Sequence, residues 1–241
     1  MLSGAAREVR AFFDASLVSP VERNRTETSS ARIRRAVVVA ATLATGAVAL
    51  GLALAVRPGD PLFYPATLGV ALLWVLGALA SGRLYLGRGR APDGSASRGV
   101  LQGFILGALL LGVFLAGALA VAQIPMLRAP VEGLLDHARY GSLALVAAIT
   151  ALNGIAEELF FRGAVYAALP PRINALGSSA LYAASTLFTG VPLLTFAAFC
   201  LGLLTAAQRR VTGGVLGPIT SHLTWSLGML LLLPPVFSLG G

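Results

Sequence analysis

The sequence AEELFFRG, at residues 156–163, lies near the end of a long apolar run that covers residues 142–169. The chain contains ten acidic residues, and from His137 to the C-terminus Glu157 and Glu158 are the only two. A carboxylate in the hydrocarbon of a bilayer costs about 2.5–3.5 kcal/mol on insertion scales, so acidic residues inside membrane segments usually mark functional sites. The glutamate pair is therefore the first candidate for chemistry.

The two glutamates are expected to have different surroundings. On a helix, Glu158 and Arg162 are four residues apart and therefore neighbours, so Glu158 has a local cationic partner. Glu157 points about 100° away and has no such partner in the sequence. We therefore expect one glutamate to be structural and the other to be available for chemistry.

The composition is that of a membrane protein. Hydrophobic residues make up 56% of the 241 residues, charged residues make up 12%, and the mean hydropathy is +0.81. The net charge of +8 would fit a nucleic-acid partner, but the basic residues lie between apolar runs, so we expect the lipid bilayer as partner and no nucleic acid. The single cysteine, Cys200, excludes an intramolecular disulfide and a cysteine-based metal cluster.

Seven apolar segments predict an all-α, polytopic integral membrane bundle of about seven transmembrane helices. They cover residues 36–56, 62–82, 99–122, 142–166, 174–190, 191–208 and 213–233. The fifth and sixth are short, so two tightly joined spans and one re-entrant feature both remain open. In the third, Gly99, Gly103 and Gly107 form a ladder of small residues, which we interpret as helix packing rather than as a dimerisation face.

The polar N-terminal tail, residues 1–35, contains seven arginines and four acidic residues. A short amphipathic segment around Val9, Phe12, Phe13 and Leu17 would fit a membrane surface, but a solvated and partly disordered tail is the preferred interpretation. The tail is too long and too charged for a cleavable signal peptide.

The arginines predict the orientation in the membrane. With the N-terminus in the cytoplasm, fifteen of the 18 arginines fall on the inner side, and only Arg57, Arg128 and Arg139 lie in outer loops. This asymmetry predicts a cytoplasmic N-terminus, an external C-terminus and a glutamate pair in the cytoplasmic half of the bilayer. The expected location is a bacterial plasma membrane.

A second polar group lies in the last apolar segment. His222 is the only histidine inside an apolar segment, and Ser226 follows one turn later on the same face. The alternative is that His222 only joins two helices by a hydrogen bond. The other histidine, His137, is expected to be solvated in an external loop on the opposite side.

Hydroxyl groups form a third polar group, in the fifth segment. They belong to Tyr182, Ser185, Thr186 and Thr189. Hydroxyls in membrane helices usually bond back to their own backbone, so we expect a structural role for all four.

These residue types are sufficient for peptide hydrolysis without a covalent intermediate. A glutamate can take a proton from water that attacks a carbonyl, and a nearby histidine can stabilise the oxyanion that develops. The same groups would also fit a proton relay in a transporter. No cofactor is expected. A divalent metal remains open, although two glutamates and one histidine are few ligands and no zinc-binding spacing is present.

The form EELFFRG, followed about sixty residues later by a histidine in a span, resembles the CPBP (Abi) family of type II CAAX prenyl endopeptidases and their bacterial relatives. The resemblance covers roughly residues 142–233. It implies an all-helical intramembrane glutamic endopeptidase that opens to the cytoplasmic side and cuts membrane-anchored proteins or peptides. By this resemblance Glu157 activates the water, and Glu158 and Arg162 support the site.

The resemblance also divides the chain into four parts. These are a cytoplasmic polar tail at residues 1–35, N-terminal transmembrane helices and loops at 36–141, a protease-like core at 142–233 and a short external tail at 234–241.

Two positions depart from the family's motifs. The second motif, Phe-x-x-x-His, has Pro192 in the place of the histidine when it is aligned on Phe188. The last motif, His-x-x-x-Asn, keeps His222 and has Ser226 in the place of the asparagine, and a hydroxyl can still donate a hydrogen bond. Either Glu157 works without the missing histidine, with Thr189 or Ser185 holding the water, or the chain has lost peptidase activity.

Three hypotheses follow from the sequence. The first is an intramembrane endopeptidase with Glu157, Glu158, Arg162, His222 and Ser226 as site residues. The second is a catalytically impaired member of the same family that binds a peptide, a lipid or a partner membrane protein. The third is a small proton-coupled transporter, which would need polar residues along both halves of a path.

Overall fold

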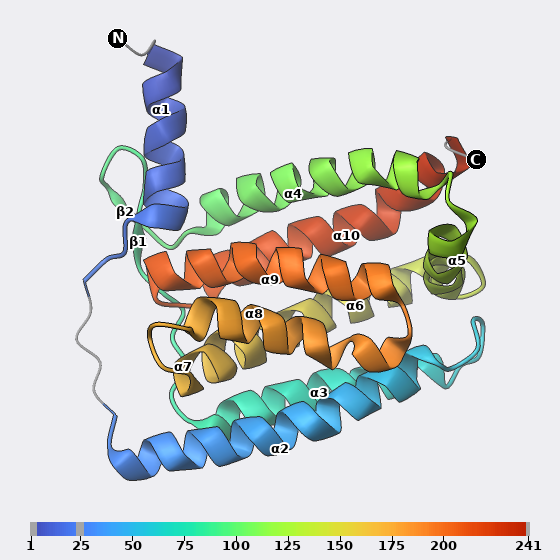
Figure 1. Cartoon of the computed structure of the whole chain (residues 1–241), viewed down its shortest axis with the longest axis horizontal. Coiled ribbons are helices and arrows are strands. Elements are labelled where there is room, and N and C mark those ends of the chain that lie inside the picture. The colour runs from blue at the N-terminus through green and yellow to red at the C-terminus, as the bar shows by residue number, and fades with distance from the viewer. Residues whose placement is uncertain (1–3, 23–26, 240–241) are drawn as a thin grey trace.

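The computed structural model describes residues 4–22 and 27–239 and shows a bundle of antiparallel helices (Figure 1). Within these residues, six helical stretches are long and apolar enough to cross a membrane, by length and composition. They are α2 (Ser29–Leu54), α3 (Phe63–Ser81), α4 (Val100–Val121), the continuous stretch Leu143–Ala168, α9 (Pro192–Thr212) and α10 (Leu216–Leu239). The prediction of an all-α polytopic membrane bundle is confirmed.

The stretch Leu143–Ala168 changes its helix type on the way. It consists of α6 (Leu143–Glu158), a π-helical segment η2 (Leu159–Val165) and a last turn α7 (Tyr166–Ala168). The predicted fourth segment, residues 142–166, therefore has the right bounds. The π-helix could not be predicted from the sequence, because its side chains continue the same apolar pattern.

The predicted fifth segment, residues 174–190, is a shorter helix than its neighbours. It forms α8 (Asn174–Ser185) followed by a 3₁₀ turn η3 (Leu187–Thr189). The two elements together run from one end of the bundle to the other, beside α9 (Figure 1). The chain reverses at Gly190, whose φ of 71° is in the left-handed region that favours glycine. The fifth and sixth segments are thus two tightly joined antiparallel elements.

The glycine ladder of the third segment packs α4 against α10. A Cβ atom added to Gly103 would lie 2.5 Å from the carbonyl oxygen of Gly217, and one added to Gly107 would lie 2.5 Å from that of Ser221. Only glycine lets the two backbones approach so closely. The packing interpretation of the ladder is confirmed.

An aromatic cluster joins α3, η2 and α8 in the interior. Trp74 stacks on Phe160 with ring centres 4.8 Å apart and lies 5.2 Å from Phe161, whose ring centre is 4.7 Å from that of Tyr182. All four side chains are buried. We call Trp74, Phe160, Phe161 and Tyr182 the aromatic cluster.

The N-terminal region is more ordered than predicted. Residues Gly4–Phe13 form α1, and Asp14–Val18 continue it as the π-helical segment η1. The expectation of a partly disordered tail is therefore wrong for these residues, because Val9 and Phe13 recur at helical spacing and Ser16 is buried where η1 packs on α9. Residues 1–3 and 23–26 of the predicted tail lie outside the described residues.

Two further boundaries differ from the prediction. α2 begins at Ser29 rather than at residue 36, because Thr28 caps it and because the buried side chain of Arg35 pairs with Glu27 and Ser81. At the other end of the chain, α10 continues to Leu239, so the predicted tail at 234–241 is helical as far as it is described. Phe237 is buried against α4 and α5 there, which favours continuation of the helix.

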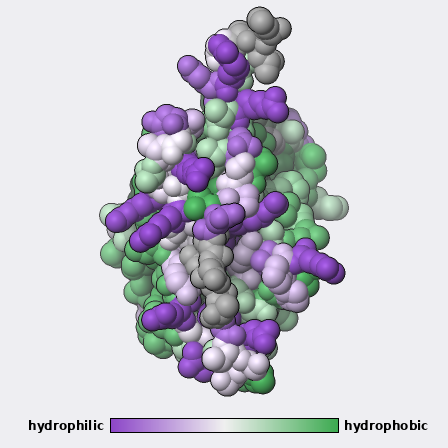
Figure 2. Space-filling view, turned by 90° about the vertical axis from the view of Figure 1, so that its left-hand side faces the viewer, coloured by the Kyte–Doolittle hydropathy of each residue, from purple (hydrophilic) through white to green (hydrophobic). Residues whose placement is uncertain are grey.

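The two ends of the bundle differ in polarity. One end carries α1, a small hairpin of β1 (Gly89–Arg90) and β2 (Ala96–Ser97), the α7–α8 connection and the α9–α10 turn (Figure 1). Hydrophilic side chains gather over this end, and apolar side chains lie at its margins (Figure 2). We call it the arginine-rich end.

The opposite end carries α5 (Pro125–Arg139), a helix within the predicted external loop. His137 in α5 is buried, and its Nε2 lies 2.9 Å from the carbonyl oxygen of Val56. The prediction that His137 is solvated is wrong, because this hydrogen bond and the ring of Phe63 enclose it.

Candidate active site

The two glutamates end α6, and the helix widens directly after them. In η2 the amide N–H of Tyr166 bonds to the carbonyl of Phe161, five residues earlier. The carbonyl oxygen of Arg162 in the middle of η2 accepts a 2.7 Å hydrogen bond from Nε of the buried Arg209 on α9. Such π-helical turns occur preferentially at functional sites. Here the turn aims the side chain of Arg162 back at the end of α6.

Glu158 is held by two cationic or potentially cationic groups. Its Oε1 lies 3.2 Å from Nη1 of Arg162 and 2.8 Å from Nδ1 of His222 on α10. The contact with Arg162 is an ion pair without hydrogen-bonding geometry, and the guanidinium also lies 4.8 Å from the ring centre of Tyr182. The side chains of Glu158 and Arg162 are fully buried, so their charges offset each other inside the bundle.

Glu157 has different partners. Its Oε2 accepts a 2.6 Å hydrogen bond from the hydroxyl of Tyr182 and lies 3.8 Å from Nε2 of His222. Its side chain retains 13% of its exposure, whereas those of Glu158 and Arg162 retain none and that of His222 retains 5%. Glu157 is therefore the carboxylate of this group that solvent reaches most readily.

His222 links the two carboxylates. Nδ1 faces Glu158 and Nε2 faces Glu157, so one imidazole ring stands between them. If the ring carries both protons, Glu157, Glu158, Arg162 and His222 sum to zero charge. A neutral group of this kind is much easier to bury in an apolar bundle than an unbalanced one. We call Glu157, Glu158, Arg162, Tyr182 and His222 the glutamate cluster.

Two glycines make room for the cluster. A Cβ atom added to Gly154 on α6 would lie 3.3 Å from Cδ2 and 3.5 Å from Nε2 of His222. One added to Gly202 on α9 would lie 3.2 Å from Nη2 of Arg162. Neither glycine stands out in the sequence, because glycine is common in membrane helices and its partners become visible only in the fold.

Three of the four hydroxyls of the predicted fifth segment have the expected backbone partners, and one does not. Ser185, Thr186 and Thr189 each donate to a backbone carbonyl three residues earlier, which confirms the structural interpretation for these three. Tyr182 donates instead to Glu157, so the expectation of a structural role fails for this residue. A tyrosine hydroxyl lies too far from its own backbone to bond back to it, and that difference could have identified Tyr182 from the sequence.

Pro192 and Ser226 lie outside the cluster. Pro192 is exposed at the first position of α9, where its missing N–H costs no helical hydrogen bond. The helix that reaches the glutamates is α8, where Tyr182 and Thr186 repeat the aromatic-x-x-x-polar spacing of the second motif. Ser226 lies one turn beyond His222, and its buried Oγ has no hydrogen-bond partner among the described residues. The structure thus brings together Glu157, Glu158, Arg162 and His222, but not Ser226.

Metal binding receives no support from the arrangement of side chains. Within residues 4–22 and 27–239, no group of three or more His, Cys, Asp or Glu side chains is placed to hold a metal ion. Arg162 supplies a fixed positive charge from the chain itself, 3.2 Å from Glu158.

A bundle of apolar helices that encloses charged residues of two different helices defines a class, the polytopic membrane proteins with an intramembrane polar site. Residues 139–228 match the family described as Type II CAAX prenyl endopeptidase Rce1-like, which supports the resemblance of this region to the CPBP family. The matched residues include the whole glutamate cluster and leave α2, α3 and α4 outside. A search of curated proteins and a search of solved structures gave no significant match.

Proposed function

We propose that the chain is an intramembrane endopeptidase that cuts membrane-anchored proteins or peptides near the arginine-rich end, and that this end faces the cytoplasm. The observation that carries the proposal is the contrast between the two glutamates. Glu158 is fully buried and held by Arg162 and His222, whereas Glu157 keeps partial exposure and is held on one oxygen only, by Tyr182. A general base needs this combination of fixed orientation and access to water.

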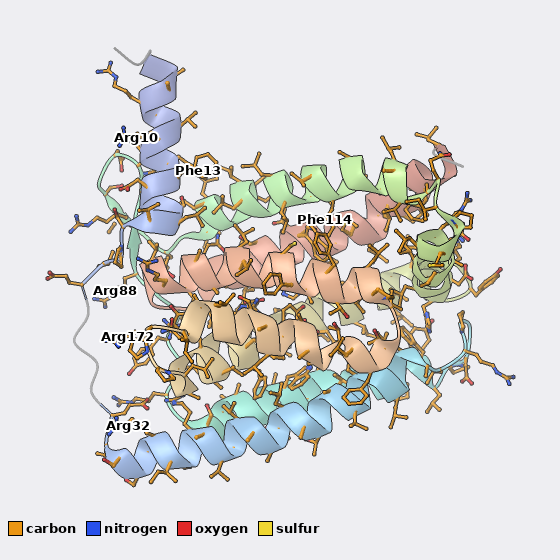
Figure 3. All side chains as sticks on the ribbon, in the orientation of Figure 1. Arg10, Phe13, Arg32, Arg88, Phe114 and Arg172 are labelled. Atoms are coloured by element: carbon orange, nitrogen blue, oxygen red, sulfur yellow. The ribbon has the colours of Figure 1, made fainter. Side chains whose placement is uncertain are left out.

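The orientation is supported by the distribution of charge. The arginines labelled in Figure 3 all lie at the arginine-rich end. They are Arg10 on α1, Arg32 on α2, Arg88 directly before β1 and Arg172 in the α7–α8 connection. Positive residues are retained on the cytoplasmic side of membrane proteins. His222 lies six residues into α10 from that end, or about 9 Å along the helix axis at 1.5 Å per residue. The cluster is therefore within reach of water and of a substrate from that side.

The proposed reaction starts with a water molecule on Oε1 of Glu157. Glu157 takes one proton from this water molecule, and the oxygen of the water attacks the carbonyl carbon of the scissile peptide bond. The carbonyl oxygen becomes an oxyanion. Nε2–H of a doubly protonated His222 donates a hydrogen bond to this oxyanion, and Nδ1–H of the same ring keeps its hydrogen bond to Glu158. When the C–N bond breaks, Glu157 returns its proton to the leaving nitrogen. Glu157 ends the cycle as the carboxylate it began as.

The protein supplies all of the groups in this scheme. Arg162 balances the charge of Glu158, which keeps Glu158 free to orient His222. Tyr182 fixes the rotamer of Glu157. The scheme needs no cofactor and no metal, so a chelator is expected to leave turnover unchanged.

A second candidate is a family member that binds a peptide or a lipid without cutting it. Among the described residues, His222 is the only histidine at the cluster, which favours this candidate. The second motif has a histidine four residues after its aromatic residue, and this chain has Thr186 four residues after Tyr182. In this case the glutamate cluster would act as a polar anchor for a partner. A transporter is the least favoured alternative, because the charged groups gather at one level of the bundle rather than along a path.

The decisive experiment compares protein termini in membranes of cells that carry the native chain with those that carry Glu157→Gln. The matched control is Glu132→Gln, which removes a carboxylate from a half-exposed pair with Arg128 on α5. Termini that are present with the native chain and with Glu132→Gln but absent with Glu157→Gln would establish proteolysis and name the substrates. Identical sets of termini for all three chains, at equal expression, would overturn the enzymatic proposal in favour of the binding one.

A further inference from the structure

The N-terminal helix α1 is placed unlike any other helix of the bundle. It runs crosswise to the spanning helices, at the arginine-rich end, and extends past the outline of the bundle (Figure 1). None of its residues is buried. A helix of ten residues is marginal in water by itself, so contacts beyond the helix must stabilise it.

The faces of α1 indicate which partner fits. Val9 and Phe13 are four residues apart and therefore share one face, and they are 57% and 39% exposed. Arg7 lies about 160° around the helix from Val9 and Arg10 about 100°, so Arg7 is on the opposite side, Arg10 flanks the apolar face, and both are exposed. Figure 3 shows Arg10 on the side of α1 that faces away from the bundle and Phe13 on the side towards which the spanning helices extend. The apolar face of α1 thus faces the layer that the spanning helices cross.

The position of α1 is fixed by its continuation. Ser16 of η1 is buried, η1 packs on α9, and the amide of Val21 donates a 3.2 Å hydrogen bond to the carbonyl of Val211. The hydroxyl of Ser19 holds the carboxylate of Asp14 at 2.8 Å. Because this segment is anchored to the last turn of α9, the C-terminal end of α1 lies at the level where the spanning helices end.

The charge around α1 indicates the kind of lipid. Exposed arginines at this end include Arg10, Arg32, Arg88 and Arg172 (Figure 3). An excess of arginine beside a membrane surface attracts anionic headgroups, with each arginine contributing roughly five-fold to the binding equilibrium. Two features of different origin, an apolar face and a basic surrounding, therefore point to the same partner.

We propose that α1 lies in the boundary between headgroups and acyl chains of the leaflet at the arginine-rich end, with Val9 and Phe13 immersed and Arg7 and Arg10 on anionic headgroups. Such helices typically insert their apolar face about 5–10 Å deep. This interaction does not depend on the proposed peptidase activity, since α1 contributes no residue to the glutamate cluster.

The test uses the full chain in nanodiscs, with spin labels on introduced cysteines. Cys200→Ser removes the native thiol, and labels are then placed by Val9→Cys and, as matched control about 200° around the helix, by Ala11→Cys. Leu109→Cys on the exposed apolar side of α4 serves as the reference for lipid contact. Collision with oxygen, which concentrates in lipid, is compared with collision with a water-soluble nickel chelate.

In discs that contain anionic phosphatidylglycerol, the label at position 9 is expected to behave like that at 109, and the label at position 11 is expected to favour the nickel chelate. Two changes should raise the ratio of nickel collisions to oxygen collisions for the label at position 9. They are discs of pure phosphatidylcholine and the double variant Arg7→Gln with Arg10→Gln. The expected increase is roughly five-fold for each arginine whose headgroup contact is lost. Nickel preference at both positions would overturn lipid contact, and equal immersion in both lipids would overturn the anionic preference. Dipolar coupling between labels of two chains would instead identify a second copy as the partner and also overturn the proposal.

Discussion

The hydroxyl of Tyr182 donates a 2.6 Å hydrogen bond to Oε2 of Glu157 and thereby joins α8 to the end of α6. The ring of Tyr182 packs at the same time on Phe161, which packs on Trp74 of α3. The orientation of the accessible carboxylate is therefore set by an aromatic cluster that reaches across the bundle. Tyr182 packs in the core through its ring and belongs to the glutamate cluster through its hydroxyl.

Tyr182→Phe removes this hydrogen bond and keeps the ring. We expect the fold to survive with a loss of about 1 kcal/mol, because one hydrogen bond to a partly exposed carboxylate is lost. Turnover should fall roughly ten-fold, since Glu157 loses its fixed rotamer. The measurement is the yield of the native new termini at equal expression. Tyr64→Phe, which removes a hydroxyl that accepts from Ser142 at the opposite end, is the matched control and should keep full activity.

Arg162→Met leaves Glu158 buried without its ion pair. Breaking a buried pair typically costs about 3–5 kcal/mol, whereas replacing both partners by apolar residues of similar size costs much less. Thermal unfolding in detergent, followed by tryptophan fluorescence, should therefore show a large loss for Arg162→Met and a smaller one for the double variant with Glu158→Met. Arg128→Met, in a half-exposed pair, is expected to cost no more than about 1 kcal/mol. A double variant less stable than Arg162→Met would contradict the charge-balance argument.

Gly154→Ala tests whether space beside His222 matters for chemistry. The added methyl group would lie 3.3 Å from Cδ2 of His222, so the ring must move by a few tenths of an ångström. Stability should be equal to that of the native chain or higher, because alanine favours a helix interior by about 0.5–1 kcal/mol over glycine. Turnover should fall nevertheless. Gly69→Ala on α3, which has open space around it, is the control for the helix effect. Unchanged turnover with Gly154→Ala would mean that the position of His222 is not critical.

Pro192→Ala tests the sequence alignment that placed Pro192 in the second motif. Because Pro192 is exposed at the start of α9 and has no contact with the glutamate cluster, turnover is expected to stay at the native level. Pro192→His should likewise fail to increase it. The same termini assay measures both variants. A change in turnover with either variant would restore Pro192 to the site and contradict its placement at the helix start.

Much of the fold follows from hydrophobic periodicity and length. The bounds of α3 and α4 and the start of α9 agree with the predicted segments within about one residue, because a bilayer demands an unbroken apolar run and polar loops end it sharply. The pair of Glu158 and Arg162 also followed from the sequence, because it depends only on helical spacing.

The parts that could not be predicted depend on contacts between distant segments. Arg35 belongs to a polar stretch, yet it is buried because Glu27 and Ser81 come together around it. Tyr182 looked like one of several hydroxyls until α8 placed it beside Glu157. The widened helix at η2 likewise depends on Arg209, which takes up the carbonyl of Arg162 from a helix 47 residues further along the chain. No local pattern carries this information.

The order of the helices along the chain has a consequence for biosynthesis. Chains are made and inserted from the N-terminus, so the membrane receives Glu158 together with Arg162 on one helix, and the two charges compensate each other at once. Tyr182 arrives with α8, and the imidazole that joins both carboxylates arrives only with α10, the last of the described helices. A ribosome-bound chain that stops before α10 therefore carries the acids without their histidine. If the cluster cuts peptides, the peptidase activity is absent during synthesis and begins only when α10 has been inserted into the membrane.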